Sequence, residues 1–276
     1  MKIVIKLLIL GPSGVMGKLI SQLALEDDNI DLLAACDKSN IGVSLGFLVG
    51  TIDKRNIVIT DVNQLDDIID KTKPDVVVDF TIASATEKNC MICVKKGVRC
   101  VIGTTALSSS FLAEFEASVK QYDAPAVISP NMATGMNVIF KIAAVLSEYL
   151  SDWDIEIIET HHNRKQDNFS GTSLKILDTI CEALDVKKEE ITKYGRTKGK
   201  ELRKKGAKNE IGIHCIRAGD IVGEHKIIYA GSGEYIELKH NAINRKCFAA
   251  GAIRAIKFIA KQKENKIFEM KDILNL

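Results

Sequence analysis

Short apolar runs alternate with amphipathic segments along the first half of the chain. The runs predict β-strands because they are continuous and rich in β-branched residues, and the segments between them predict helices. Strands that are apolar throughout indicate a parallel sheet covered by helices on both faces. The predicted strands are residues 6–10, 30–36, 57–60, 74–80, 98–102 and 126–129, and the predicted helices are 15–25, 62–71, 86–96 and 108–122, the last with Ser108 as its N-cap.

The pattern changes after Asn131. Charged residues alternate with apolar ones in the later strands, which indicates an open sheet with one solvated face. We therefore expect a second domain to begin near this residue. Its predicted helices are 137–150 and 172–184, and its predicted strands are 153–159, 211–216, 221–230 and 235–239. A long apolar helix is predicted at 244–261, and periodicity alone does not assign it to either domain.

Composition and charge favour an ordinary globular protein. The 276 residues carry 38 Lys and Arg against 36 Asp and Glu, a net charge of +2, so charge gives no reason to expect a nucleic acid or a membrane as partner. No apolar run approaches the roughly 18 residues of a membrane span. Residues 1–10 are faintly similar to a signal peptide, but Lys6 interrupts them and a glycine-rich turn follows, so we interpret them as a buried strand. Seven cysteines, an odd number, are typical of free thiols in the cytoplasm.

Two further segments have both a plain and a functional interpretation. Residues 187–208 hold ten basic and three acidic residues with three glycines. They are typical either of a solvated, mobile loop or of a nucleic-acid-binding patch, and the lack of interleaved aromatic residues favours the loop. Cys90 and Cys93 form a C-x-x-C pair within a predicted helix. Redox pairs usually lie exposed at a helix start, so we expect these two thiols in the core.

A glycine-rich loop joins the first predicted strand to the first predicted helix. Gly11, Gly14 and Gly17 follow a G-x-x-G-x-x-G pattern. In a dinucleotide-binding loop the first glycine permits a tight turn, the second admits a pyrophosphate close to backbone N–H groups, and the third lets the helix pack on the strand. Asp37 lies 20 residues after Gly17, at the end of the next predicted strand, where a carboxylate can bind an adenosine ribose. The alternative is a glycine turn in a sheet without a cofactor.

The residues around this loop bear on which nucleotide is used. Asp37 favours NADH, whose ribose hydroxyls it can bind, whereas Lys38 can pair with the additional phosphate of NADPH. The hypothesis is that both cofactors serve. The turns Phe80–Thr81 and Gly103–Thr105 follow other predicted strands, at the edge where such sheets bind ligands. They either hold the nicotinamide end of the cofactor or are ordinary strand-to-helix turns.

The densest candidate chemistry lies in residues 159–173, which read E-T-H-H-N-R-K-Q-D-N-F-S-G-T-S. The Ser-Gly-Thr turn opens a predicted helix, whose free N–H groups form an anion site, and Lys165 adds a positive charge. Imidazoles, a cation and a helix N-terminus together suit a small substrate that carries carboxylates.

Two other interpretations of this segment stay open. His161 and His162 could begin a metal site with Asp167 and His225, but adjacent residues of an extended segment point in opposite directions, which makes joint ligation awkward. The segment could also be a surface loop that is merely polar.

Taken together, these motifs resemble the 4-hydroxy-tetrahydrodipicolinate reductases, also called dihydrodipicolinate reductases. The matches span almost the whole chain in the expected order. The family's G-x-x-G-x-M-G lies at residues 11–17, D-F-T at 79–81, G-T-T at 103–105, E-x-H-H-x-x-K-x-D-x-x-S-G-T at 159–172, R-x-G-D-I-V-G-E-H at 217–225 and the tail F-E-M-K-D-I-L at 268–274. The His-His-Lys block is highly specific, whereas the glycine loop alone is not.

The resemblance implies an α/β protein with two domains. A Rossmann-like parallel-sheet domain combines residues 1–131 with 241–276 and binds the dinucleotide. Residues 132–240 form an α+β domain with an open mixed sheet, which binds the substrate and builds a homotetramer. The implied reaction is the NAD(P)H-dependent reduction of 4-hydroxy-tetrahydrodipicolinate to tetrahydrodipicolinate, with loss of water, in lysine and diaminopimelate biosynthesis.

The resemblance also implies a role for each site residue. His161 is the acid/base residue and Lys165 is the proton donor. The substrate carboxylates are held by His162, Ser170, Gly171 and Thr172, with Arg245 as a further candidate. No metal is implied, and NADH or NADPH is bound by Gly11, Pro12, Ser13, Gly14, Val15, Met16, Gly17, Asp37, Lys38, Phe80, Thr81, Gly103, Thr104, Thr105, Ser129, Pro130, Asn131 and Met132.

Two segments depart from the family pattern. Asn168-Phe169 stands where the family usually has Ala-Pro, and the loss of the proline frees the backbone before the anion site. Met132 stands where an aromatic residue could lie against the nicotinamide. The backbone contacts of this segment can persist, but that stacking cannot.

Three rival functions are weighed against this one. Another Rossmann reductase, acting on a semialdehyde or imine, would have no reason for a His-His-Lys block beside an anion-binding turn. An NAD(P)-binding sensor of the same fold would bind NADH without turnover and would not need Lys165. A nucleic-acid binder would use residues 187–208 and retain DNA in a strongly salt-dependent way.

Overall fold

The computed structural model describes residues 4–203 and 209–276. Contacts within the chain divide it into two compact units. Unit 1 is Met1–Thr134 together with Arg245–Leu276, and unit 2 is Gly135–Asn244. Unit 1 therefore uses two separate stretches of sequence, and unit 2 is a continuous insertion between them. The sequence analysis put the two boundaries after residues 131 and 240, where the contacts divide the chain after 134 and 244.

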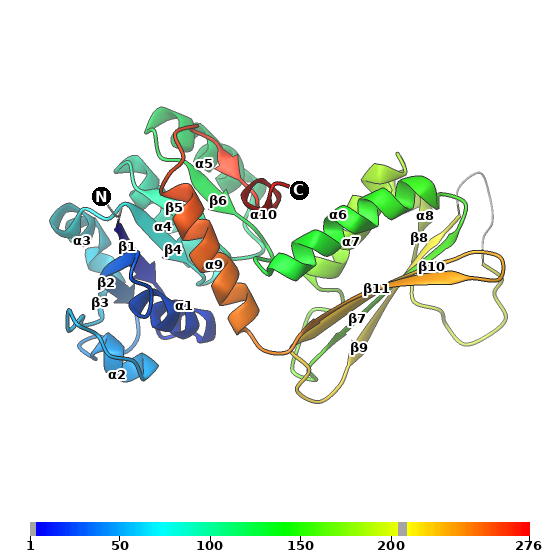
Figure 1. Ribbon diagram of the computed structural model, residues 1–276, viewed down its shortest axis with the longest axis horizontal. Helices are drawn as coiled ribbons and strands as arrows, with labels where there is room; N and C mark the ends of the chain where they lie inside the picture. Colours follow the sequence, from blue (N-terminus) through cyan, green and yellow to red (C-terminus); the bar gives the residue numbers. More distant parts are fainter. Residues whose placement is uncertain (1–3, 204–208) are drawn as a thin grey trace. The chain divides into compact units, whose positions relative to one another are not determined.

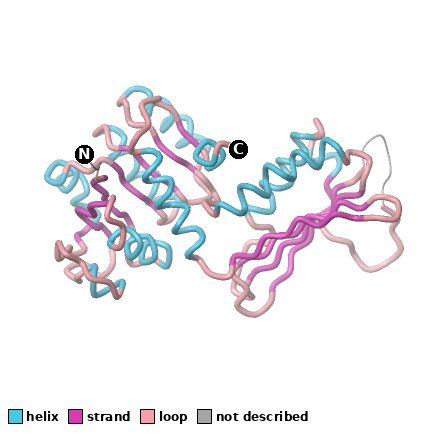
Figure 2. Tube along the Cα trace, viewed as in Figure 1, coloured by secondary structure: helices cyan, strands magenta, loops and turns pink. Residues whose placement is uncertain are grey.

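Unit 1 is a Rossmann-like parallel sheet with helices on both faces, which confirms the predicted fold class (Figures 1 and 2). In the described residues the sheet has seven strands in the order β12-β6-β5-β4-β1-β2-β3, and its strand pairs are parallel. The strands are β1 (Ile5–Leu10), β2 (Ile30–Asp37), β3 (Thr60–Asp61), β4 (Val76–Asp79), β5 (Arg99–Ile102), β6 (Ala126–Ile128) and β12 (Ile267–Phe268). The helices are α1 (Val15–Leu25), α2 (Leu45–Val49), the 3-10 turn η1 (Val62–Gln64), α3 (Leu65–Thr72), α4 (Ala83–Lys95), α5 (Ser109–Gln121), α9 (Lys246–Ile259) and α10 (Met270–Leu274).

Each face of this sheet has its own apolar core. Leu7 and Ile9 of β1 belong to the core that contains α1, α9 and α10, whereas Leu8 and Leu10 belong to the core that contains α3, α4 and α5. Ile256 and Ile259 of α9 are fully buried in the first core. Because α9 follows unit 2 in sequence, the first face is closed only when the C-terminal segment folds back onto it (Figure 1).

Unit 2 is a mixed sheet that packs on helices, as predicted. Its described strands are ordered β11-β10-β7-β9-β8, with β7, β8 and β9 parallel to one another and β10 antiparallel to both of its neighbours. The strands are β7 (Asp154–His161), β8 (Thr192–Tyr194), β9 (Ile211–Arg217), β10 (Gly223–Ala230) and β11 (Tyr235–Ala242), and the helices are α6 (Thr134–Tyr149), α7 (Gly171–Ala183) and α8 (Lys188–Ile191).

A buried tyrosine ties α6 to this sheet. The hydroxyl of Tyr229 on β10 donates to the Ala143 carbonyl at 3.0 Å and lies 3.0 Å from the Ser147 hydroxyl. Burial raises the pKa of Tyr229 to about 12, so the phenol stays protonated. Figure 1 shows α6 along one face of the sheet. The opposite face carries polar side chains such as Glu156, His214 and Lys226, none of them fully buried, which agrees with the predicted open sheet.

Four parts of unit 1 and one part of unit 2 differ from the sequence prediction. The predicted strand 57–60 is shortened to β3, because Ile57 and Ile59 exchange backbone hydrogen bonds with residues 43 and 45 instead of extending the sheet edge. The short elements α2, β12 and α10 were not predicted. In unit 2, the predicted loop 187–208 contains α8 and β8, so the loop assignment is wrong for residues 188–194. Residues 204–208 of that prediction lie outside the described residues.

The cysteine prediction is confirmed. All seven cysteines are free, and Cys90 and Cys93 are fully buried in the core beneath α4. Burial raises the pKa of several of these thiols, to about 12 for Cys36, so they are not reactive thiolates. Over the described parts of the chain, none of the helices has the length and apolar character that crossing a membrane requires.

Candidate active site

The glycine loop lies between β1 and α1, and two of its glycines are required by the fold itself. Gly11 has a φ of +71°, which side chains rarely adopt, and it lets the chain turn sharply at the end of β1. A Cβ at Gly17 would lie 1.9 Å from the Gly11 carbonyl oxygen, so only glycine lets α1 approach the strand. At Gly14 a Cβ would meet nothing closer than 3.5 Å. This middle glycine is therefore not needed for internal packing, as expected of a position kept open for a phosphate.

Asp37 connects the end of β2 to the glycine loop. Its Oδ2 accepts a hydrogen bond from the Ser13 backbone N–H at 2.9 Å. Its Oδ1 accepts from the backbone N–H groups of Lys38 and Ser39 at 2.7 and 3.1 Å. The carboxylate therefore holds the loop in place, and the side chain of Lys38 is exposed beside it.

A cavity of about 390 Å³ opens above these residues, at the carboxyl ends of the strands. It collects much of the predicted cofactor set: Gly11, Ser13, Gly14, Asp37, Lys38, Phe80 and Thr81. It also includes residues that the sequence analysis missed, namely Leu10, Cys36, Ser39, Val62, Ile82, Ala85 and Asn89. Val62, Ile82 and Ala85 are apolar residues at or near helix starts, a common pattern, so the sequence carried no distinctive signal for them. The Gly103–Thr105 turn and the Ser129–Met132 segment are not among its lining residues.

Asp79, at the end of β4, joins the two turns that were expected to hold the nicotinamide end. Its Oδ1 accepts hydrogen bonds from the Thr81 backbone N–H (2.8 Å) and from the hydroxyls of Thr81 (2.7 Å), Thr86 (2.9 Å) and Thr104 (3.3 Å). Burial raises the pKa of Asp79 by more than these hydrogen bonds lower it. A Cβ at Gly103 would lie 2.1 Å from the Phe80 ring, so glycine there lets the second turn close against the first.

The Ser129–Met132 segment is fixed by contacts of its own. The Ser129 hydroxyl donates to the Asn131 carbonyl at 2.9 Å, and the Asn131 side chain accepts from the Ala133 N–H at 2.9 Å. The Met132 side chain is buried in the core shared with α1 and α9. It is a core residue, so the backbone is the part of Met132 that the predicted cofactor contact has to use.

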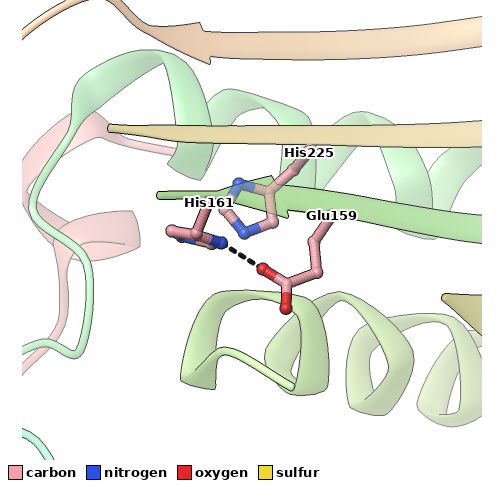
Figure 3. A group of neighbouring side chains, drawn as sticks. All are labelled: Glu159, His161 and His225. Atoms are coloured by element: carbon pink, nitrogen blue, oxygen red, sulfur yellow. Dashed lines mark ion pairs between the residues drawn. The ribbon is translucent and has the colours of Figure 1, made fainter. Parts of the chain in front are cut away.

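In unit 2 the candidate chemistry gathers at the end of β7, on the face that α7 covers. Glu159 is fully buried and forms an ion pair with His161 Nδ1 (Figure 3). It forms a second ion pair with Arg217 Nη2 at 2.8 Å. Burial alone would raise the pKa of Glu159, but the hydrogen bonds from His161 and Arg217 hold it below its ordinary value. The parallel register of β7 and β9 pairs His161 with Arg217, which is why these distant residues meet.

His225 of β10 lies beside this pair and is linked to the start of α7. Its ring is edge-on to the His161 ring, with centroids 5.3 Å apart, and its Nε2 lies 3.1 Å from the Ser170 hydroxyl. Burial lowers the pKa of His225 to about 3, so the imidazole is neutral. Ser170 is the N-cap of α7 and accepts a hydrogen bond from the Ser173 N–H at 3.1 Å. Next to it, a Cβ at Gly171 would meet nothing within 4 Å, so the helix start is open at this position.

Lys165 lies in the connection between β7 and α7. Its Nζ is 2.7 and 2.6 Å from the two carboxylate oxygens of Asp167. Although burial would raise the pKa of Asp167, the hydrogen bond from Lys165 lowers it. The departure at Asn168-Phe169 is compensated locally: Arg217 donates to the carbonyls of Asp167 (2.7 Å) and Asn168, and the Phe169 ring packs on Tyr194 with centroids 5.1 Å apart.

The structure thus brings His161 and Ser170 together around Glu159, Arg217 and His225. The sequence analysis noticed Glu159 and Arg217 only as parts of motifs, and His225 as part of a motif and as a possible metal ligand. It places Arg245 in unit 1, at the N-cap of α9. The possible metal ligands differ from the set considered in the sequence analysis, which was His161, His162, Asp167 and His225. Within the described residues, the group with suitable ligand atoms is Glu159, His161 and His225, whose atoms lie within 4.8 Å of one another.

Comparisons with known proteins identify the family of this chain. The family models described as "Dihydrodipicolinate reductase, N-terminus" and "C-terminus" match residues 5–132 and 135–274. A 4-hydroxy-tetrahydrodipicolinate reductase of Methanosarcina barkeri is 42% identical over 99% of this chain and 100% of its own. The counterpart from Methanocaldococcus jannaschii is 41% identical over 99% and 98%.

A comparison with solved structures finds the same family. A dipicolinate-bound dihydrodipicolinate reductase from Paenisporosarcina sp. TG-14 superposes with a TM-score of 0.76 at 26% identity, covering 97% of this chain and 98% of its own. An amine dehydrogenase from Mycobacterium smegmatis, at 13% identity and a TM-score of 0.60, shares the fold alone.

The fold and the residue clusters define an oxidoreductase of the nicotinamide-dependent Rossmann class. Both family models and the full-length relatives narrow this further. The chain belongs to the dihydrodipicolinate reductase family. It is an NAD(P)H-dependent reductase of lysine and diaminopimelate biosynthesis.

Proposed function

We propose that this chain reduces 4-hydroxy-tetrahydrodipicolinate to tetrahydrodipicolinate, with NADH or NADPH as the reductant. The ring hydroxyl leaves as water, so one proton is taken up for each hydride transferred. The observation that carries the proposal is the cluster at the end of β7, where an imidazole, an ammonium and a helix N-terminus suit a dicarboxylate that must also be protonated. A sensor without turnover gives no reason for this arrangement.

The glycine loop and its neighbours fit a dinucleotide. The loop between β1 and α1 offers a helix start without acidic residues, and Gly14 leaves room for a phosphate. The cofactor-binding set is the one predicted from the sequence, with Ile82, Val62 and Ala85 added as apolar lining of the cavity. When bound, the nicotinamide supplies the hydride. Asp79 holds the Thr81 and Thr104 turns in place for it.

The residues of unit 2 bind and protonate the substrate. The α7 N-terminus at Gly171 and Thr172, together with His162, holds carboxylates by charge-assisted hydrogen bonds of roughly 1.5–3 kcal/mol each. The Ser170 hydroxyl is engaged with His225 and Ser173, so its role is to hold the start of the helix. Lys165 delivers the proton and His161 is the acid/base group. Arg245 stays a candidate for a further carboxylate contact.

The first test replaces the proton donor. In an assay that follows NAD(P)H absorbance, with substrate generated by the preceding synthase from pyruvate and aspartate semialdehyde, Lys165→Ala should lower kcat by ~10²–10⁴-fold, the usual contribution of a positioned acid. NADH affinity, measured by calorimetry, should not change.

Lys188→Ala is the matched control, because Lys188 also pairs with an aspartate, Asp178, at 2.9 Å on the same unit. Its kcat should equal that of the wild type. An unchanged kcat in Lys165→Ala would remove this lysine from the mechanism, and a wild-type protein that binds NADH without oxidising it would instead support the sensor.

A second test concerns the choice of cofactor. With the Asp37 carboxylate at the loop and the Lys38 ammonium exposed beside it, we expect both NADH and NADPH to serve. Their kcat/KM values should lie within about a thousandfold of each other, since one ion pair with the ribose phosphate contributes only a few kcal/mol. Lys38→Ala should lower kcat/KM for NADPH while sparing NADH. A larger gap between the two cofactors in the wild type would contradict this interpretation of the pair.

The chemistry is proposed to need no metal. The Glu159 carboxylate and one nitrogen of each histidine already have partners: Glu159 pairs with Arg217 and with Nδ1 of His161, and Nε2 of His225 contacts Ser170. A cation would have to displace Arg217 from a buried carboxylate. Dialysis against a chelator should leave kcat unchanged, and a loss restored by Zn²⁺ or Mn²⁺ would contradict the proposal.

We further propose a homotetramer in the cytoplasm, with neither a nucleic acid nor a membrane as partner. The polar face of the unit 2 sheet also exposes Ile216 and Tyr235, 47% and 65% accessible, and this mixed surface suits a subunit interface. The seven free thiols suit a reducing compartment. Light scattering should give the mass of four chains, and a monomer would contradict the assembly.

A further inference from the structure

We propose that Glu159 is the positioning residue for His161: it fixes the orientation and the tautomer of that imidazole, with Arg217 as its counter-charge. The inference rests on the proposed function, because it explains how the acid/base histidine is held for proton transfer. Glu159 does not meet the substrate in this scheme. It acts only through the ring that it contacts.

Burial separates the two residues into a support and a reactive group. The Glu159 side chain is completely inaccessible to solvent, whereas 12% of the His161 side chain is accessible. Figure 3 shows the carboxylate pointing at one edge of the His161 ring, with His225 alongside. A carboxylate in this place cannot exchange protons with solvent directly. It can only orient its neighbour and balance the neighbour's charge.

The other edge of the His161 ring is kept clear. A Cβ at Gly223 would lie 3.2 Å from Nε2 of His161, a contact tighter than side chains normally tolerate, and glycine removes it. With Nδ1 directed at Glu159, the nitrogen left for chemistry is therefore Nε2. The neutral ring then carries its proton on Nδ1 and offers a lone pair at Nε2.

Arg217 makes a buried carboxylate tolerable in this place. An isolated charge in the interior is costly, and it is kept only where it is paired. Arg217 pairs with Glu159 Oε1 at 2.8 Å and uses the same guanidinium to hold the Asp167 carbonyl at 2.7 Å, beside the Lys165–Asp167 pair. The pair therefore links the acid/base histidine to the segment that carries the proton donor.

The kinetic test compares two isosteric substitutions on one strand. Glu159→Gln keeps the shape and removes the charge, so kcat should fall on the order of 10²-fold while KM for NADH stays within about twofold. Glu156→Gln is the matched control, since Glu156 also binds an arginine (Arg203) and a histidine (His214, 2.7 Å), but on the opposite face of β7. It should keep the wild-type kcat, with the oligomeric mass checked in both variants. Equal kcat for Glu159→Gln and the wild type would overturn the inference.

A spectroscopic test does not depend on any variant being active. Histidine side-chain ¹⁵N–¹H correlation spectra distinguish the two neutral tautomers, and the chain has only five histidines to assign. At a pH where the ring is neutral, His161 of the wild type should be protonated at Nδ1. In Glu159→Gln the amide oxygen should turn to Arg217 and the NH₂ to Nδ1, which moves the ring proton to Nε2. A wild-type ring protonated at Nε2 would overturn the inference even if Glu159→Gln failed to fold.

These outcomes are separable from the failure of the proposed function. If the wild-type enzyme did not oxidise NAD(P)H with this substrate, the proposed reaction would fall, and the tautomer measurement would still report on the Glu159–His161 contact. If the wild type turned over and Glu159→Gln matched it, the reaction would stand and only the positioning role would be lost.

Discussion

Two carboxylates, one in each unit, are completely buried and yet sit in opposite electrical environments. Asp79 at the end of β4 is surrounded by neutral donors, the hydroxyls of three threonines and one backbone N–H. Glu159 near the end of β7 is bracketed by the Arg217 guanidinium and the His161 imidazole. Both are at the carboxyl end of a central strand, and both support residues expected to touch a ligand.

The comparison shows that burial alone does not decide the charge of a carboxyl group. The pKa of Asp79 is raised, because burial outweighs its hydrogen bonds. The pKa of Glu159 is lowered, because burial is outweighed by the hydrogen bonds and charges of His161 and Arg217. Neutral donors suit a carboxylate that organises two turns, whereas a cationic partner suits one that supports proton transfer.

The largest expected effect follows from removing the charge of Glu159. Glu159→Gln leaves the Arg217 guanidinium partly buried beside a neutral amide, and breaking such a pair typically costs about 3–5 kcal/mol. Urea denaturation followed by the fluorescence of Trp153, the single tryptophan, reports on unit 2 directly. Glu156→Gln, whose carboxylate is partly exposed, should lose no more than about 1 kcal/mol. Equal losses in the two variants would remove the distinction between buried and exposed pairs.

A more gradual effect, spread over several pH units, is expected from acid. The pKa of His225 is about 3 in the folded state against an ordinary 6.5, so the unfolded state binds the additional proton. The free energy of unfolding is therefore unaffected by His225 above pH 6.5. It falls as the pH drops from 6.5 towards 3, with a slope of up to about 1.4 kcal/mol per pH unit. Glu159, whose pKa is lowered, adds a loss of the same sign further into acid.

Urea denaturation followed by Trp153 fluorescence also measures this loss of stability in acid. His225→Asn should flatten the pH dependence between 6.5 and 3 relative to the wild type. A wild-type stability that stays constant over this range would mean that His225 is protonated in the fold.

The smallest effect is expected at Asp79. Asparagine keeps an oxygen that accepts from the threonine hydroxyls, so Asp79→Asn should change the stability of unit 1 by no more than about 1 kcal/mol at neutral pH. The sign of its pH dependence is opposite to that of Glu159. Because the folded pKa of Asp79 is raised above 3.8, its stabilising contribution is present below that pH and is lost as pH rises through the folded value.

Amide hydrogen exchange of β4 and β5 checks this sign. Relative to the wild type, Asp79→Asn should protect these strands better at pH 7 than at pH 4. Better relative protection at pH 4 than at pH 7 would mean that a positive charge near Asp79 lowers its pKa. The pKa values of Asp79 and Glu159 would then shift in the same direction.

Local signals in the sequence predicted local structure well. The helix expected at 15–25 begins and ends at those residues, because a glycine loop precedes it and its apolar positions keep helical spacing. Ser108 caps α5 through the Phe111 N–H, as predicted. The strand at 57–60 failed because its apolar residues pair locally with residues 43–45, and alternation cannot identify a strand's partner.

The candidate site was predictable in its residue types but not in its pairings. Glu159 and Arg217 stand 58 residues apart and meet through the parallel register of β7 and β9, which no local pattern encodes. His225 joins them only because β10 runs antiparallel on the other side of β7. The family motifs contained all three residues, yet their roles emerge only from the contacts.

The return of α9 also has a consequence for how the protein is made. While the chain is being synthesised, the sheet of unit 1 leaves the ribosome with one apolar face covered only in part, by α1, and the roughly 110 residues of unit 2 must follow before α9 is available to complete it. At 5–20 residues per second this interval lasts about 6–20 s. Unit 2, being continuous in sequence, can fold during that time. The order of assembly is thus inner unit first and outer unit last, with nascent unit 1 the stage most exposed to aggregation.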